Sequence, residues 1–150
     1  MGFLDLADRS WPVLDKVMGA HVILYRATNG LVGKRFPGVP DMLLLDHIGA
    51  KTGKRRTSAL VYIEDGENLV LIASKGGHPS HPAWFHNLNA HPDVRVQVGR
   101  ERRAVRARVA SDKERDRLWP KAVEAYSGYG TYQQRTDRKI PVVILEPREA

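Results

Sequence analysis

The hydrophobic pattern near the N-terminus has the period of an α-helix. Apolar residues recur there at steps of three and four, as Leu4, Ala7, Trp11, Leu14, Met18, Val22 and Tyr25. This spacing predicts an amphipathic helix over residues 10–28, ended by Asn29-Gly30. We expect the helix to cover a sheet. The alternative is peripheral contact with a membrane, although a polar face that holds Asp15 and Lys16 together is not strongly basic.

From residue 42 the period changes to that of β-strands. Residues 29–41 form a loop rich in glycine and proline. Beyond it, apolar runs and alternating valine and arginine predict six short strands, with turns at Asp65-Gly66 and Gly99. The predicted strands are 42–48, 57–64, 68–74, 94–98, 104–109 and 142–145.

Helices are predicted at the margins of these strands. One covers residues 82–90, where Ser80 or His81 could cap the first turn. Another begins at Ser111 and Glu114, which have the spacing of a capping box. Short strands joined by tight turns, with helices outside them, predict an α+β, mainly antiparallel fold built on a small β-barrel.

A length of 150 residues fits one domain with its own core. We expect residues 1–40 to form an N-terminal helix and loop, and residues 41–150 to form the barrel domain. The chain has no cysteine, which excludes disulfides, thiolate nucleophiles and cysteine-ligated zinc and suits a cytoplasmic protein. Four histidines over residues 78–91 are separated by prolines, so we predict no metal site.

A net charge of +7 predicts an anionic partner. That partner could be nucleic acid, an acidic lipid surface or a polyanionic small molecule. The arginines of residues 95–108 alternate along strands and lack the interleaved aromatic residues of proteins that bind single strands. We therefore expect no nucleic-acid partner.

Two segments combine glycine with cations, as anion sites do. Residues 49–56 hold four cations, two glycines and Thr52, but not the spacing of a Walker loop. Residues 74–77, Ser-Lys-Gly-Gly, join a strand to a helix, where free backbone N–H groups and a lysine favour a phosphate or carboxylate. Trp84 and Phe85 could pack against a planar ring. The alternatives are an exposed basic hairpin and a tryptophan that belongs to the core.

Three tyrosines, Tyr126, Tyr129 and Tyr132, are spaced by three. In a helical segment they lie on one side. Such a stripe is more often part of a core. Here Gly128 and Gly130 interrupt it, which is typical of a mobile wall over a pocket.

Four motifs follow one another between residues 42 and 147. They are Gly49-x-Lys51-Thr52-Gly53-x-x-Arg56, Ser74-Lys75-Gly76-Gly77, Pro82-x-Trp84-x-x-Asn87-Leu88, and Tyr132-Gln133 with Thr136-Asp137-Arg138-x-Ile140-Pro141. Together they resemble the deazaflavin-dependent nitroreductase family. The resemblance implies a split β-barrel of the FMN-binding type and coenzyme F420, a deazaflavin with a phosphate and an oligoglutamate tail. It also implies hydride transfer from reduced F420 to a quinone, a nitroaromatic compound or another conjugated acceptor.

The same resemblance gives each motif a role. The residues that would hold the phosphate and the glutamate tail are Lys51, Thr52 and Arg56. Those that would complete the cofactor site are Ser74, Lys75, Gly76, Gly77, Trp84 and Asn87. Those that would shape the acceptor pocket are Val61, Tyr126, Tyr129 and Tyr132. Those that would give the acceptor a hydrogen bond or a proton are Ser74, Tyr129 and Tyr132.

Two positions depart from the best-known nitroreductase of that family. Val61 stands where that enzyme has a tyrosine, and Arg135 where it has a tryptophan. Both positions lie on the acceptor side, so nitroimidazole activation is not implied. The alternatives to a reductase are a split-barrel protein that binds FMN or haem and one that carries a deazaflavin without turning it over.

Overall fold

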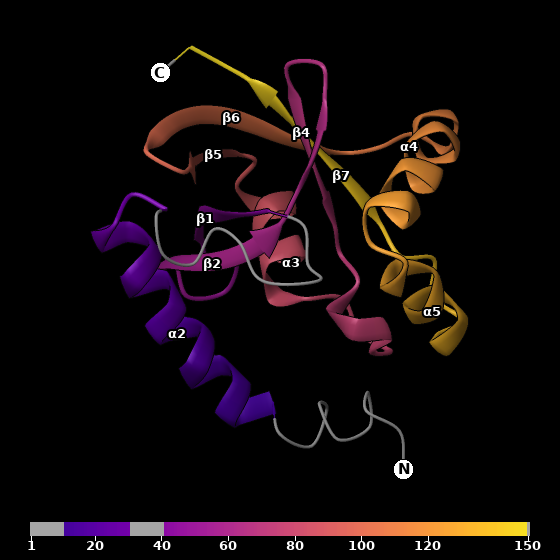
Figure 1. Ribbon diagram of the computed structural model, residues 1–150, viewed down its shortest axis with the longest axis horizontal. Coiled ribbons are helices and arrows are strands. Elements are labelled where there is room, and N and C mark those ends of the chain that lie inside the picture. Colours follow the sequence, from indigo (N-terminus) through magenta and orange to yellow (C-terminus); the bar gives the residue numbers. More distant parts are fainter. Residues whose placement is uncertain (1–10, 31–40, 150) are drawn as a thin grey trace.

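The computed structural model describes residues 11–30 and 41–149, which form a curled antiparallel sheet with helices around it (Figure 1). The strands are β1 (Met42–Ile48), β2 (Arg55–Val61), β3 (Ile63–Asp65), β4 (Asn68–Ile72), β5 (Asp93–Val98), β6 (Glu101–Val109) and β7 (Val142–Pro147). The helices are α2 (Trp11–Ala27), α3 (Ala83–Ala90), α4 (Asp112–Ala125) and α5 (Gly128–Arg135), with a short 3-10 helix η1 (Lys75–Gly77). The first ten residues, and residues 31–40 of the loop predicted for 29–41, lie outside the described part.

One stretch of chain forms both edges of the sheet. The strand order is β2-β1-β5-β6-β7-β4-β3, and every neighbouring pair is antiparallel. β2 therefore lies at one edge and β3 at the other, although only Tyr62 separates them in the sequence. The sheet curls until the chain itself links its two edges, which gives the split β-barrel that we expected.

The prediction of one strand over residues 57–64 is wrong at Tyr62. Val61 is the last residue of β2 that pairs with β1, and Ile63 is the first that pairs with β4. Between them the chain changes partner, and the Tyr62 ring enters the core of the barrel with 7% of its surface exposed. A continuous apolar run cannot show such a change of partner.

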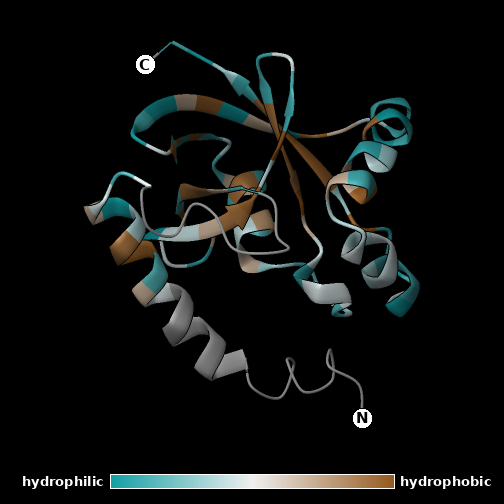
Figure 2. Ribbon diagram, viewed as in Figure 1, coloured by the Kyte–Doolittle hydropathy of each residue, from teal (hydrophilic) through white to brown (hydrophobic). Residues whose placement is uncertain are grey.

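The continuous apolar runs belong to strands that are covered on both faces. In β4, Leu71 packs inside the barrel, whereas Ile72 packs outside it against α4 and α5. β7 divides in the same way between Val143 and Ile144. In β5 and β6 one face is largely exposed, so apolar residues alternate there with arginines, although Gln97 near the end of β5 is buried. Figure 2 shows hydrophobic residues concentrated in the strands and a largely hydrophilic α4, whereas Ile23 and Leu24 of α2 are exposed.

Helix α2 is fastened to the sheet by one tyrosine and one ion pair. The buried Tyr25 hydroxyl accepts a hydrogen bond from the Gly99 N–H (2.8 Å) and lies 3.0 Å from the carbonyl oxygen of Met42. Arg26 Nη2 lies 2.8 Å from Asp46 Oδ1 on β1. The helix covers the sheet, as expected. Within residues 11–30 and 41–149, no helix combines the length and the hydropathy that a bilayer crossing requires.

Helix α3 fills one end of the barrel. Trp84, Phe85 and Leu88 pack among the inward side chains of the strands. The N-cap of α3 is Pro82, so the prediction that Ser80 or His81 caps it is wrong. The reason is that both are engaged elsewhere: Ser80 Oγ lies 2.8 Å from His78 Nδ1, and His81 Nδ1 lies 3.0 Å from Arg138 Nη1. The predicted capping box of α4 is confirmed.

Candidate active site

The turn between β1 and β2 carries four cations into solvent. It is closed by hydrogen bonds from the Gly49 N–H to the Lys54 carbonyl oxygen (2.8 Å) and from the Gly53 N–H to the Gly49 carbonyl oxygen (2.9 Å). The exposed cations are Lys51, Lys54, Arg55 and Arg56. Among the described residues, none of the four has a carboxylate within 4.0 Å. Clustered cations without acidic partners suit a polyanionic ligand.

Asn87 of α3 holds this cationic turn from within the protein. Its side chain is 6% exposed, and Oδ1 accepts a hydrogen bond from the Ala50 N–H (2.8 Å). The amide nitrogen therefore faces His47 and donates to Nδ1 (2.9 Å). His47 Nε2 then carries the proton and donates to Ser58 Oγ (2.9 Å). Both ends of the Asn87 amide, which we expected to contact the cofactor, are thus hydrogen bonded inside the protein.

His47 is a component of the site that the sequence did not reveal. It lies 4% exposed on β1, opposite Arg56 of β2. Burial, together with the nearby Arg56 charge, lowers the pKa of His47 from 6.5 to about 4, so the ring is neutral at pH 7. A single histidine within an apolar strand carries no pattern that would have marked it.

We expect acid to weaken the fold through His47. Its folded pKa of about 4 is lower than the unfolded value of 6.5, so the unfolded chain binds more protons between these pH values. The free energy of unfolding should fall as the pH drops from 6.5 towards 4, by up to roughly 3 kcal/mol. Urea unfolding of the wild type and of His47→Gln at pH 7 and pH 4.5 measures this fall. If the free energy of unfolding falls equally in the two proteins, His47 is not its cause.

The second candidate turn consists of η1 and the Ser74 that precedes it, and the three residues of η1 have a left-handed backbone. The φ angles are 45° at Lys75, 62° at Gly76 and 79° at Gly77. The Gly77 N–H donates to the Ser74 carbonyl oxygen (2.9 Å), and the His78 N–H donates to that of Lys75 (3.1 Å). A left-handed lysine costs of order 1–3 kcal/mol and is typical of a functional turn.

Residues 132–138 hold this turn from its other side. Arg135 Nη1 donates to the Gly76 carbonyl oxygen (3.0 Å), and Arg138 Nη2 donates to that of Ser74 (2.6 Å). A Cβ atom on Gly77 would lie 2.6 Å from the carbonyl oxygen of Tyr132. Arg138 belongs to one of the four sequence motifs, but no role was predicted for it.

The three tyrosines lie together but differ in exposure. The hydroxyl oxygens of Tyr126 and Tyr132 are 2.9 Å apart, and both side chains are half-buried. Tyr129 is 5% exposed and belongs to the apolar cluster under α4 and α5. Val61 packs against the same cluster, so the four residues expected in the acceptor pocket are neighbours. Burial raises the pKa of Tyr129 and of Tyr132, so both hydroxyls stay protonated at neutral pH.

Helix α3 links the two candidate turns. Asn87 contacts the cationic turn at Ala50, and His81, just before the helix, contacts Arg138, which holds Ser74. Figure 1 shows α3 and η1 at the same end of the barrel. Trp84 itself is 8% exposed and packs in the barrel core, in agreement with the core alternative for this residue.

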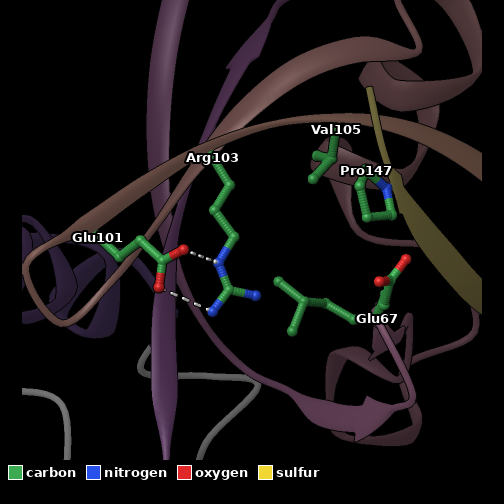
Figure 3. A pocket seen from close by; sticks show the side chains of 6 residues that line it. Glu67, Glu101, Arg103, Val105 and Pro147 are labelled. Atoms are coloured by element: carbon green, nitrogen blue, oxygen red, sulfur yellow. Dashed lines mark hydrogen bonds and ion pairs between the residues drawn. The ribbon is translucent and has the colours of Figure 1, made fainter. Parts of the chain in front are cut away.

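A cavity of about 350 Å³ lies away from these turns (Figure 3). Its lining residues are Glu67, Leu69, Glu101, Arg103, Val105 and Pro147. Glu67 precedes β4, whereas Ser74 follows that strand, so the cavity lies at the opposite end of β4 from η1. Arg103 Nε lies 3.0 Å from Glu101 Oε1, its neighbour on β6, and both line the cavity. None of the residues predicted for the site lines it.

Comparison with known proteins gives a consistent picture. Residues 17–147 match the model of the F420H(2)-dependent quinone reductase family. The chain is 45% identical to an F420H(2)-dependent quinone reductase of Mycobacterium tuberculosis over 136 residues, which cover 89% of this chain and 91% of that protein. A solved F420-H2 dependent reductase (FDR-A) is 43% identical, with a TM-score of 0.65 over 70% of this chain and 93% of that one. A solved structure described as a domain-swapped dimer is 38% identical, with a TM-score of 0.69 over 90% and 99%.

Proposed function

Because the chain belongs to the F420H(2)-dependent quinone reductase family, we propose that it reduces a quinone at the expense of reduced F420. The observation that carries this proposal is the pair of turns beside α3. One presents four cations that have no acidic partner among residues 11–30 and 41–149, and the other is a left-handed turn that includes Lys75. An anionic tail and a phosphate on one ligand match these two features.

The residues of the first turn fit the tail of such a cofactor. Lys51 and Arg56 are exposed, so they can pair with carboxylates without first breaking an ion pair among the described residues. The Thr52 hydroxyl accepts a hydrogen bond from the Lys54 N–H (3.3 Å), which leaves its own proton to donate to an anion. Asn87 and His47 fix the turn so that less conformational freedom is lost on binding.

The residues of the second turn would lie against the phosphate and the ring edge. Ser74 and Gly77 are buried and Lys75 and Gly76 half-buried, so this turn sits deeper than the cationic one. Trp84 packs in the barrel core, so it would contribute to the cofactor site only through the small part of its surface that is exposed. When bound, reduced F420 supplies a hydride to the acceptor from its ring.

The acceptor would lie against the half-buried tyrosine pair. Tyr132 keeps its proton at neutral pH and can donate a hydrogen bond to the acceptor oxygen that gains negative charge. Tyr126, 2.9 Å away, can return a proton to Tyr132. Tyr129, which we expected to act directly, is buried beneath this pair and would support it. Ser74 is the second candidate donor.

Titration with F420, followed by acceptor-dependent oxidation of its reduced form, tests the proposal. We expect binding to the wild type and turnover with menadione, and at least a tenfold lower kcat for Tyr132→Phe with an unchanged Kd for F420, because a positioned proton donor contributes about 10²–10⁴-fold. Tyr129→Phe is the matched control and should change kcat less. FMN is titrated in parallel.

Four outcomes would count against the proposal or part of it. Absence of F420 binding would refute it outright, and tighter binding of FMN would favour the FMN alternative. Binding of F420 without oxidation by menadione, a nitroimidazole or an unsaturated lactone would favour a deazaflavin carrier. Equal kcat values for the wild type and both tyrosine variants would leave the tyrosines with a structural role only.

A further inference from the structure

The guanidinium of Arg138 donates to four acceptors on a single loop, residues 73–81. The acceptors are the carbonyl oxygens of Ala73 (3.1 Å from Nη1), Ser74 (2.6 Å from Nη2) and His78 (2.8 Å from Nε), and Nδ1 of His81 (3.0 Å from Nη1). These bonds use four of the five N–H groups of the side chain. Because a guanidinium is rigid and planar, it fixes the four acceptors relative to one another.

Residues 75–77 of the loop that Arg138 holds have a strained backbone. All three residues are left-handed, and the backbone hydrogen bonds described within this short turn are those of the Gly77 and His78 N–H groups. A strained turn persists only where its surroundings hold it. Arg138 bonds to the carbonyl of Ser74, the first residue of the turn, and to that of His78, the residue just after it, so it fixes both ends.

The charge of Arg138 is met by carbonyl dipoles. Within the described part of the chain, no carboxylate lies within 4.0 Å of this guanidinium. The side chain is half-buried, and burial lowers its pKa, although an arginine stays protonated at any pH near neutrality. Its positive charge therefore adds to the potential at a turn that we assign to an anion.

We propose that Arg138 is a positioning residue that keeps the Ser74–Gly77 turn in its anion-binding conformation and acts through the loop backbone rather than by contact with the cofactor. The proposal rests on the proposed function, because the anion is the phosphate of F420. It predicts that loss of the guanidinium fork loosens the turn before any ligand is added, and lowers affinity as a result.

Arg115 provides a matched control. It is also a half-buried arginine, and it holds the same C-terminal region: Nε donates to the Ile140 carbonyl oxygen (3.2 Å) and Nη2 to Gln133 Oε1 (3.2 Å). None of its described hydrogen bonds reaches residues 73–81. Arg115→Lys therefore removes an equivalent fork without touching the loop.

The experiment compares Arg138→Lys with Arg115→Lys in the full chain. Without ligand, amide hydrogen exchange at Gly77 and His78 should be at least tenfold faster in Arg138→Lys, and unchanged in Arg115→Lys. Fluorescence titration should then give a Kd for F420 at least tenfold higher in Arg138→Lys and within about twofold of the wild type in Arg115→Lys. The KM for menadione should not change in either. Arg138→Gln repeats the test if the lysine variant does not fold.

Each result decides between the two proposals. If amide hydrogen exchange at Gly77 and His78 is as slow in both Arg138 variants as in the wild type, the positioning role is overturned, whatever the Kd for F420. Faster exchange with an unchanged Kd also overturns it, because the turn would not be the anion site. If the wild type itself does not bind F420, the proposed function fails, whereas faster exchange confined to Arg138 variants would still show that this side chain holds the turn.

Discussion

Replacing Lys51 and Arg56 together by alanine is expected to raise the Kd for F420 by at least tenfold. Hydrogen bonds to charged groups contribute about 1.5–3 kcal/mol each, whereas exposed ion pairs contribute about 0.2–1 kcal/mol. These cations are exposed in the free protein, so we expect each contact with F420 to contribute an amount between these two ranges. Two contacts then give at least the 1.4 kcal/mol that corresponds to a factor of ten. Fluorescence titration at low and high salt measures the effect, which should shrink as salt screens the charges.

The matched control removes the same charge from another hairpin. Arg100 and Arg102 are exposed at the turn between β5 and β6, so Arg100→Ala with Arg102→Ala lowers the net charge equally without altering the cationic turn. We expect its Kd for F420 to stay within about twofold of the wild type. Equal losses in the two double variants would mean that overall charge attracts the cofactor and that Lys51 and Arg56 form no site.

Gly77→Ala is expected to lower the free energy of unfolding by about 2–4 kcal/mol and to remove F420 binding. Its φ of 79° disfavours any side chain, at a cost of about 1 kcal/mol. The added Cβ would also lie 2.6 Å from the Tyr132 carbonyl oxygen, and overpacking costs about 1–3 kcal/mol more. Because that oxygen belongs to backbone, relief requires α5 to move away from the turn. Urea unfolding and F420 titration measure the two effects.

Gly66→Ala separates the two causes. Gly66 has a φ of 61°, and a Cβ built there would have no atom within 4 Å. This variant therefore measures the cost of the left-handed backbone alone, and it should bind F420 normally. If Gly77→Ala is no less stable than Gly66→Ala, then α5 does not press on the turn as closely as the structure indicates.

The fold was predictable where a local pattern determines it. Strand β1 was predicted with its observed bounds, and the capping box located the start of α4, because both depend on neighbours in sequence. The separation of β2 and β3 at Tyr62 was not predictable, since it depends on which distant strand each residue pairs with. The family resemblance was identified from four motifs and is confirmed by the family match.

The sequence marks the exposed parts of the candidate site but not the residues that support them. Glycines and cations mark the two turns in the sequence itself, and the tyrosine spacing marks α5. His47 and Arg138 hold these elements through hydrogen bonds over 40 and up to 65 positions, respectively. No periodicity encodes such contacts. The burial of Tyr129 beneath its two neighbours is equally a result of how α5 packs on β4 and β7.

The exposed outer face of β5 and β6 has a practical consequence. Arg102 projects from it into solvent, and the chain contains no cysteine. A thiol introduced at that position would be unique in the molecule, so a dye could be attached there selectively. Such a label would report ligand-induced motion from a surface that lies outside the two turns proposed for the coenzyme.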